Sequence, residues 1–335
     1  MIIYITKLTN MKNILITGGE GYIGSHIVET FLNKKLNVYI IDKQKKGSKN
    51  LINKRCLFIK ENILNQKKVR DVLIKNKIDS IVHLAALIDV QAGEKNKAKF
   101  YKNNVLGTKK LIKASKNTFV KNIIYSSSAG VYGKATSPVS ENTITKPINY
   151  YSKTKLQSEK LIKKLCKKYN FNYCILRYFN VCGASSSGKL GIIDKKNKSL
   201  FKVLAKQVLK KKPYINIYGK NFNTKDGSCI RDFIHVSDLS EIHFKILQYI
   251  DKIKKSLILN CGYGKGYSVL EVVKKFQIIS RKKINIIFKK ERKNEIIISY
   301  ANTSNFKKIV KWKPKFNNLN KMIKSSMHWE KKLIK

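Results

Sequence analysis

A glycine-rich turn between an apolar segment and an amphipathic helix is the feature that most restricts the fold of this chain. The turn reads TGGEGYIG at positions 17–24, and the helical pattern Gly21–Asn33 begins within it. Gly18 and Gly21 let the backbone turn tightly and approach a pyrophosphate, while Gly24 allows the helix to pack closely on the strand. The N-terminus of such a helix also favours an anion. This spacing indicates a dinucleotide-binding turn.

The first 180 residues alternate short apolar runs with amphipathic helical patterns. Strands are expected at Asn13–Thr17, Val38–Asp42, Leu57–Ile59, Ser80–Leu84, Asn122–Ser126 and Tyr173–Leu176, and further helices at Asn65–Asn76, Lys99–Ser115 and Tyr151–Tyr169. Continuous apolar strands joined by helices are typical of a parallel sheet that is covered on both faces. We therefore expect an α/β fold with a doubly wound parallel sheet of the Rossmann type, whose ligands lie beyond the carboxyl ends of the strands. After Arg177 the segments become shorter and more basic, which indicates a smaller, partly discontinuous C-terminal domain.

Asp42 lies at the end of the second expected strand. A carboxylate there can accept hydrogen bonds from a ribose 2′-hydroxyl and would repel a 2′-phosphate, so it favours NAD over NADP. Lys43, Lys45 and Lys46 follow directly, and NADP therefore stays an alternative.

The chain is strongly basic, with 71 Lys and Arg against 20 Asp and Glu and a formal net charge of +51. Such a field attracts nucleic acid and acidic membranes. The lysines form no single block, however, and largely fall on the outer faces of amphipathic helices. This favours a solvated basic surface, which also suits an anionic nucleotide, over a dedicated nucleic-acid site.

The cysteine and hydropathy patterns favour a cytoplasmic protein. The six cysteines form no CxxC pair, and with five scattered histidines no metal-ligand spacing is present, so we expect free thiols and no metal. No apolar run of 18 residues indicates a membrane span. The first ten residues lack the pattern of a signal peptide, and we expect Met1–Asn10 to be an extension outside the fold core.

A YxxxK motif, YSKTK at positions 151–155, provides the candidate catalytic residues. Its spacing puts Tyr151 and Lys155 on one face of a helix. A nearby ammonium favours the phenolate and lowers the pKa of tyrosine from its ordinary value of about 10. Ser128 follows the fifth strand, where it can bond a substrate hydroxyl and relay its proton, or cap a turn. Asn103 and Asn104 are either part of a local turn or helix, or a cofactor contact.

Together these segments resemble the extended short-chain dehydrogenase/reductase family, and within it the UDP-glucose 4-epimerases. In chain order the matching segments are TGGEGYIGSH (17–26), HLAAL (83–87), NNVLGT (103–108), SSSAGVYG (126–133), YSKTK (151–155), RYFNVCGA (177–184), DGSCIRDFIHVSDL (226–239) and LNCGYGKGYSVLEV (259–272). The resemblance extends from Met11 to about Trp329. It implies NAD as cofactor, a UDP-hexose as substrate, and a homodimer formed through helices that include Lys99–Ser115 and the YxxxK helix.

Carried over by position, the resemblance implies two sets of binding residues. The cofactor would contact Gly18, Gly21, Tyr22, Ile23, Gly24, Asp42, Asn62, Ile63, Leu84, Ala85, Ala86, Leu87, Asn103, Ser128, Tyr151, Lys155 and Phe179. The UDP-sugar would contact Ser128, Tyr151, Asn180, Ser199, Leu200, Tyr218, Arg231, Arg292 and Ser299. The two arginines suit a diphosphate, because a guanidinium donates several charge-assisted hydrogen bonds.

The resemblance also implies two domains. Residues 11–180, with about 231–262, would form the NAD-binding domain. Residues 181–230, with about 263–335, would form the UDP-sugar-binding domain.

The chain departs from the family pattern at several binding positions. Asn62 replaces a usual Asp at the adenine, and Ile88 replaces a Lys that some members carry near the cofactor phosphates. Ser199 replaces a usual Asn near the uridine, and the usual Arg-x-Gly-Asp reads RKNE at positions 292–295. Ser299 replaces the bulky Tyr of strict glucose/galactose epimerases, as in members that also accept N-acetylhexosamines.

The resemblance implies that UDP-glucose and UDP-galactose are interconverted. Tyr151, as phenolate, would take the proton of the sugar 4-hydroxyl with Ser128 bridging, while a hydride passes between C4 and NAD. The 4-keto sugar would then turn over while Arg231 and Arg292 keep the UDP anchored.

Two alternatives stay open. A nucleotide-sugar dehydratase or decarboxylase would share the fold, although dehydratases carry an Asp-Glu pair after the catalytic hydroxyl where this chain has Ser128-Ala129-Gly130. A basic RNA-binding protein on the same scaffold would explain the charge, although no basic-aromatic RNA motif stands out.

Overall fold

The structure, a computed structural model, describes residues 13–43, 56–194 and 197–334. The predicted extension Met1–Asn10 lies outside these residues, as do Lys45 and Lys46. Among the described residues, no helix has the length and apolar character needed to cross a membrane.

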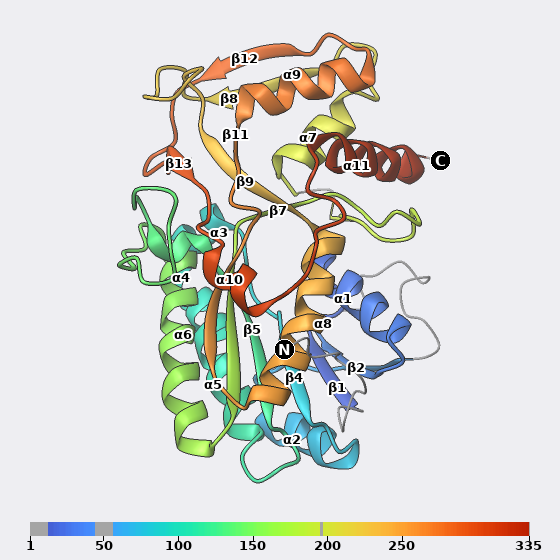
Figure 1. Cartoon of the computed structure of the whole chain (residues 1–335), viewed down its shortest axis with the longest axis vertical. Coiled ribbons are helices and arrows are strands. Elements are labelled where there is room, and N and C mark those ends of the chain that lie inside the picture. The colour runs from blue at the N-terminus through green and yellow to red at the C-terminus, as the bar shows by residue number, and fades with distance from the viewer. Residues whose placement is uncertain (1–12, 44–55, 195–196, 335) are drawn as a thin grey trace.

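A parallel seven-stranded sheet forms the larger part of the fold (Figure 1), with the strand order β10-β6-β5-β4-β1-β2-β3. The strands are β1 (Asn13–Thr17), β2 (Asn37–Asp42), β3 (Cys56–Lys60), β4 (Ser80–His83), β5 (Asn122–Ser128), β6 (Asn172–Tyr178) and β10 (Leu257–Cys261). The order reverses between β1 and β4, and doubly wound sheets bind their ligands beside such a reversal.

Helices cover both faces of this sheet. On one face α1 (Tyr22–Asn33) packs against α8 (Val236–Ile253), and their apolar side chains share a core with β1 and β6. On the other face lie α2 (Gln66–Lys75), α5 (Gly107–Ala114) and α6 (Tyr150–Tyr169), which bury a second core. The predicted doubly wound α/β fold is therefore confirmed.

Most predicted elements are found with ends that differ by one or two residues, and one helix differs in kind. The segment predicted as a single helix, Lys99–Ser115, consists of α4 (Lys97–Phe100), a π-helical segment (Tyr101–Leu106) and α5. The wider π turn places Asn103 and Asn104 inside the protein, and such turns are frequent at functional sites. In addition, β5 reaches Ser128 rather than ending at Ser126.

Most of the remaining elements lie beyond the carboxyl ends of the main sheet, in the upper part of Figure 1, whereas α10 (Ser304–Ile309) packs against β10. Strands β7 (Asn180–Cys182), β9 (Ile230–His235), β11 (Gly266–Ser268) and β13 (Ile298–Ser299) form a second sheet, and β8 (Tyr214–Tyr218) pairs with β12 (Asn285–Lys289). Helices α7 (Leu200–Gln207), α9 (Val269–Ser280) and α11 (Leu319–Ile334) bury a third core there. Two short helices, α3 (Val90–Lys95) and α10 (Ser304–Ile309), complete the described chain. The domain boundaries predicted from the sequence stay a prediction.

Candidate active site

The glycine-rich turn connects β1 to α1 at the reversal of strand order. Gly18 has a φ of +75°, and a Cβ on it would lie 2.8 Å from the backbone nitrogen of Ala85. A Cβ on Gly24 would overlap the carbonyl oxygen of Gly18. The N-cap of α1 is Gly21, which offers no side-chain acceptor to the first amides of the helix. These amides are thus available to an anion, and the turn fits a pyrophosphate.

Asp42 ends β2 beside this turn, and its Oδ2 accepts a hydrogen bond from the Glu20 amide at 3.3 Å. The Tyr22 hydroxyl donates to the carbonyl oxygen of Gly183 at 2.7 Å, which links the turn to the segment after β7. Ile23 packs against the first core. The carboxylate is therefore held where a ribose on the turn would meet it.

Three further predicted cofactor residues contact other parts of the protein. Asn62 accepts a hydrogen bond from the Leu64 amide at 3.0 Å, and Ile63 is buried against Gly107. Asn103 accepts a hydrogen bond from Lys43 Nζ at 2.5 Å. Contact of these three side chains with a cofactor stays a prediction.

The segment after β4, with Leu84, Ala85 and Ala86, is partly exposed and runs past the turn. Asn104 fixes its end, because its side chain bonds both the amide and the carbonyl of Leu87, at 2.8 and 3.0 Å. The same side chain donates to Thr154 Oγ1 of α6 at 3.0 Å. The sequence left Asn104 as a local feature or a cofactor contact, and it did not predict these partners, which lie 17 and 50 positions away.

Phe179 follows β6, and its amide donates to the carbonyl of Cys261 at 3.0 Å. Its ring is buried with Val131, Tyr132 and Val139. The structure thus gives Phe179 a packing role, and contact with a cofactor stays a prediction.

Ser128, Tyr151 and Lys155 meet at the carboxyl end of β5. The Ser128 side chain is close enough to the Tyr151 hydroxyl to lower its pKa. Lys155 is 2% exposed, its Nζ donates to the carbonyl of Ser126 at 2.7 Å, and it lies 5.9 Å from the centre of the Tyr151 ring. Ser128 Oγ also accepts from the Gly130 amide at 3.1 Å, so the turn-cap interpretation holds beside the catalytic one.

Burial dominates the electrostatics of the pair. It raises the pKa of Tyr151 to about 12, against the hydrogen bond from Ser128. It lowers the pKa of Lys155 to about 7, against the carboxylate of Glu159. The lysine alone therefore does not produce the lowered tyrosine pKa expected from the sequence, because the phenolate loses more from desolvation.

A cavity of about 490 Å³ lies between the second sheet, the β8–β12 pair and α7. Six of the predicted substrate residues line it, namely Asn180, Ser199, Leu200, Tyr218, Arg231 and Arg292. Ser299 is not among its lining residues but lies on β13, in register with Arg231.

Both arginines of the cavity have partners within it. Arg231 donates to Glu295 at 2.7 Å and to the carbonyl of Ile297 at 3.0 Å. The Arg292 guanidinium lies 4.1 Å from the centre of the Tyr218 ring. Within the described part of the chain, the buried Ser199 Oγ has no hydrogen-bond partner, so it is available to a polar ligand.

Comparison with known proteins agrees with this geometry. The profile of the NAD dependent epimerase/dehydratase family matches residues 14–262. The UDP-glucose 4-epimerase of Azospirillum brasilense is 32% identical over 321 residues, which cover 96% of this chain and 92% of that protein. The crystal structure of UDP-glucose-4-epimerase from Stenotrophomonas maltophila with bound NAD and formylated UDP-arabinopyranose is 28% identical, with a TM-score of 0.92 over 96% of this chain and 99% of that one. The UDP-Glc/GlcNAc 4-epimerase from the human pathogen Campylobacter jejuni is 36% identical, with a TM-score of 0.83 over 96% and 99% of the two chains. The resemblance seen in the sequence is thus confirmed, and the chain belongs to the NAD dependent epimerase/dehydratase family.

Proposed function

We propose that the protein is an NAD-dependent epimerase that interconverts UDP-glucose and UDP-galactose by inverting C4 of the hexose. The observation that carries this proposal is the meeting of Ser128, Tyr151 and Lys155 at the end of β5, in a chain that also has the glycine-rich turn and the arginine-lined cavity. The UDP-glucose 4-epimerase of Azospirillum brasilense supports the choice of reaction.

Gly18, the start of α1 and Asp42 would hold the cofactor. When bound, NAD supplies a hydride acceptor for sugar C4 and a positive charge beside the phenol. As phenolate, the Tyr151 oxygen would accept the proton of the 4-hydroxyl and later return it, with Ser128 Oγ as the bridge. The Lys155 ammonium, which lies at the carboxyl end of β5, would favour the phenolate form of Tyr151.

The cavity would hold the nucleotide while the hexose turns. Arg231 and Arg292 donate to the diphosphate, and the Tyr218 ring packs on the uracil. Firm contacts at the nucleotide and few at the hexose let the 4-keto sugar present either face of C4 to the same hydride donor.

A wider substrate range is a second proposal. Ser299 occupies little space on β13, and the Campylobacter jejuni relative is a UDP-Glc/GlcNAc 4-epimerase. We expect turnover of UDP-GlcNAc, and we expect Ser299→Tyr to remove it while turnover of UDP-glucose is kept. Absence of UDP-GlcNAc turnover in the unchanged enzyme contradicts this proposal.

The homodimer and the cytoplasmic location also remain proposals. Helices α5 and α6 pack side by side on one face of the sheet, and we propose that they form the contact between two copies. Light scattering on the eluting protein gives twice the chain mass if this holds. None of the six cysteines, all of which lie in the described residues, forms a disulfide, which supports a reducing compartment.

The function is tested by incubating the purified protein with UDP-galactose, with and without added NAD, and measuring UDP-glucose. We expect turnover in at least one arm, and turnover without added NAD if the cofactor co-purifies. Tyr151→Phe should lower kcat by about 10²- to 10⁴-fold, since it removes the proton-transfer group. Tyr150→Phe removes the neighbouring hydroxyl on α6 and should keep full activity. No turnover in either arm from folded, NAD-loaded protein contradicts the proposal.

A further inference from the structure

Three consecutive serines at the end of β5 each face one residue on a single face of α6. Ser128 acts on the Tyr151 hydroxyl, and the carbonyl of Ser126 accepts a hydrogen bond from Lys155. Between them, Ser127 Oγ donates to Glu159 Oε1 at 2.5 Å. Tyr151, Lys155 and Glu159 are spaced four residues apart, so they follow one another along the helix. Glu159 is therefore a third member of the face that carries the Tyr–Lys motif.

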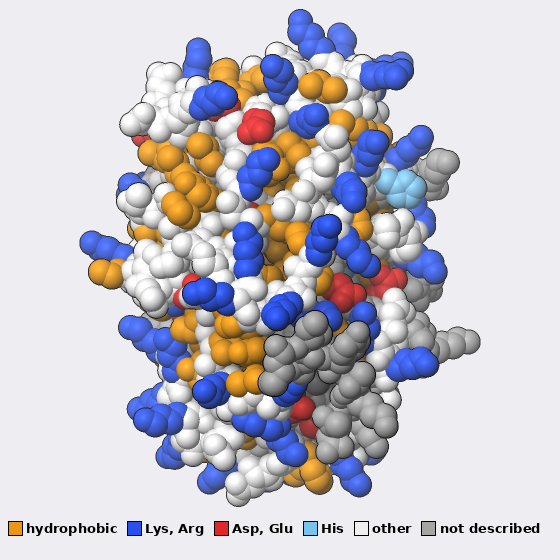
Figure 2. Space-filling view, viewed as in Figure 1, with side chains coloured by type: hydrophobic (Ala, Val, Ile, Leu, Met, Phe, Trp, Pro, Cys, Tyr) orange, Lys and Arg blue, Asp and Glu red, His pale blue; other side chains and the backbone are white. Residues whose placement is uncertain are grey.

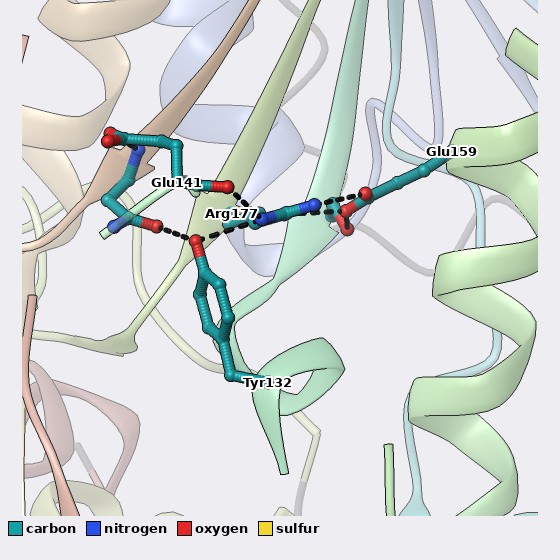
Figure 3. Close-up of polar contacts among 6 residues, drawn as sticks. Tyr132, Glu141, Glu159 and Arg177 are labelled. Carbon is teal, nitrogen blue, oxygen red and sulfur yellow. Dashed lines mark hydrogen bonds and ion pairs between the residues drawn. The ribbon is translucent and has the colours of Figure 1, made fainter. Parts of the chain in front are cut away.

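Glu159 is 1% exposed and is held by Arg177 of β6, which is 3% exposed (Figure 3). Arg177 donates through Nε to Oε1 at 3.1 Å and through Nη2 to Oε2 at 2.7 Å. This bidentate geometry holds the carboxylate on both oxygens. Removal of one partner would leave a buried charge without compensation.

Arg177 is fixed on its other side as well (Figure 3). Its Nη1 donates to the Tyr132 hydroxyl at 3.0 Å and to the carbonyl of Glu141 at 3.3 Å. The Tyr132 hydroxyl in turn donates to Asn260 of β10 at 2.7 Å. The pair thus joins α6 to strands β5, β6 and β10 directly behind the catalytic residues.

Lys155 faces a small set of titratable and charged groups. On α6 these are Tyr151 and Glu159. On β5 the group is Tyr125, whose ring centre lies 4.9 Å from Lys155 Nζ, and on β4 it is His83. Burial raises the pKa of Tyr125 and lowers that of His83 to about 3, so both are neutral at neutral pH. The carboxylate of Glu159 is therefore the anion that acts on Lys155 from within this set.

We propose that the Glu159–Arg177 ion pair is a positioning device for the reaction, which keeps Lys155 charged and holds the end of β5 against α6. This inference rests on the proposed function, because it assigns the charge of Lys155 a role in epimerisation. The carboxylate stabilises the ammonium, and the guanidinium limits that effect and keeps the carboxylate in place. The two partners therefore act on Lys155 with opposite signs.

The test compares the pH dependence of kcat in the NAD-loaded enzyme with that of two single variants and a double variant. Glu159→Gln removes the anion and leaves the Arg177 charge, so the alkaline limb should move to lower pH by about one pH unit. On that limb kcat then falls about tenfold, with little change in KM. Arg177→Met leaves the anion and should move the same limb to higher pH. The double variant Glu159→Gln/Arg177→Met removes both charges and should lie between the two.

A matched control is the buried pair Lys202–Glu330, which joins α7 and α11 at 2.7 Å. Glu330→Gln should lower the melting temperature but leave the alkaline limb in place. A merely structural Glu159–Arg177 pair would behave in the same way, and limbs that coincide in all variants overturn the inference.

A second readout separates this inference from the proposed function. The titration of Lys155 is followed by NMR of ¹⁵Nζ-lysine-labelled protein, with the signal assigned by its loss in Lys155→Met. Opposite shifts in the two single variants, together with no turnover in the unchanged enzyme, would refute the proposed function and keep the charge-setting role. Turnover with an unmoved Lys155 titration would refute the positioning role alone.

Discussion

Lys155 combines a cationic side chain with nearly complete burial, and this conflict defines the site at the scale of single residues. Its Nζ donates to the carbonyl of Ser126, and burial lowers its pKa to about 7. Burial also disfavours the charged form of Tyr151, because it raises the pKa of the phenol to about 12. Two groups whose environments disfavour both charged forms are typical of a site for proton transfer.

The first prediction concerns stability at Lys155. The folded pKa of about 7 lies below the ordinary 10.5, so the unfolded chain binds a proton that the folded chain lacks between these values. Stability of the unchanged protein therefore rises with pH across this window. Lys155→Met should gain most over the unchanged protein below pH 7, and this gain should disappear as the pH approaches 10.5. Urea unfolding at several pH values measures it.

Lys153→Met provides the control for this prediction, because Lys153 lies on the same helix and is exposed. Its stability difference should not change with pH. Equal pH dependence in the two variants would contradict the account of Lys155. Only Lys155→Met should lose epimerase activity.

Single residues also show which side-chain pairs can be predicted from the sequence and which cannot. Tyr151 and Lys155 could be paired from their helical spacing. Glu159 continues that spacing, so the signal for it was present in the sequence. Its partner Arg177 and the Arg231–Glu295 pair could not be found in this way, since the latter joins residues 64 positions apart through the fold.

At the scale of elements, the strand–turn–helix unit β1–α1 shows how local sequence determines a binding surface. The short apolar strand and the stripe on α1 are periodic patterns, and both were predicted closely. The π-helical segment Tyr101–Leu106 was not predicted, because its hydrogen bonding changes without a change in apolar pattern. The burial of Asn104 beside Leu87 depends on contacts between segments that are separate in the sequence and meet only in the folded protein.

The second prediction concerns the turn. Gly24→Ala should remove bound NAD from the purified protein and lower its melting temperature, because the added Cβ overlaps the Gly18 carbonyl oxygen. Gly21→Ala should have a smaller effect, because its Cβ would lie 3.2 Å from that oxygen. The nucleotide released on denaturation and a thermal melt provide both values. An unchanged NAD content in Gly24→Ala would show that the turn does not hold the cofactor.

At the scale of the whole molecule, the charge of +51 sets the long-range field. Figure 2 shows Lys and Arg side chains scattered over the viewed face between apolar and uncharged groups, rather than gathered in one patch. Charge dispersed in this way steers anions towards the face as a whole. The division into two domains, predicted from the shorter and more basic segments after Arg177, stays a prediction.

The third prediction follows from this field. Raising the salt concentration should lower kcat/KM for UDP-galactose, because added ions screen the attraction of the anionic substrate. The value of kcat should stay constant, since the Lys155 charge at the reacting end is buried. Steady-state kinetics across a salt series measures both. A kcat/KM that does not change with salt would assign the surface charge no part in substrate capture.

The fourth prediction concerns acid stability. Burial lowers the pKa of His26 and His243 to about 4, and of His83 and His235 to about 3. Above the ordinary value of 6.5 these groups are neutral in both states, and below it only the unfolded chain binds their protons. Stability should therefore fall as the pH decreases from 6.5 towards 4.

His243→Gln should make that fall less steep, because it removes one of the four groups. The exposed His328 supplies the control, and His328→Gln should leave the slope unchanged. Urea unfolding midpoints between neutral and mildly acidic pH measure the slope. Identical slopes in the two variants would contradict the role given to the buried histidines.

The central claim is that C4 is inverted through hydride transfer, and one labelling measurement tests it most directly. UDP-glucose that carries deuterium at C4 is incubated with the NAD-loaded enzyme, and the UDP-galactose formed is examined by NMR and mass spectrometry. The account predicts that the deuterium is found at C4 of the product, because the same hydride returns to the other face. Deuterium lost to solvent, or moved to C6 as a dehydratase would move it, would contradict the account.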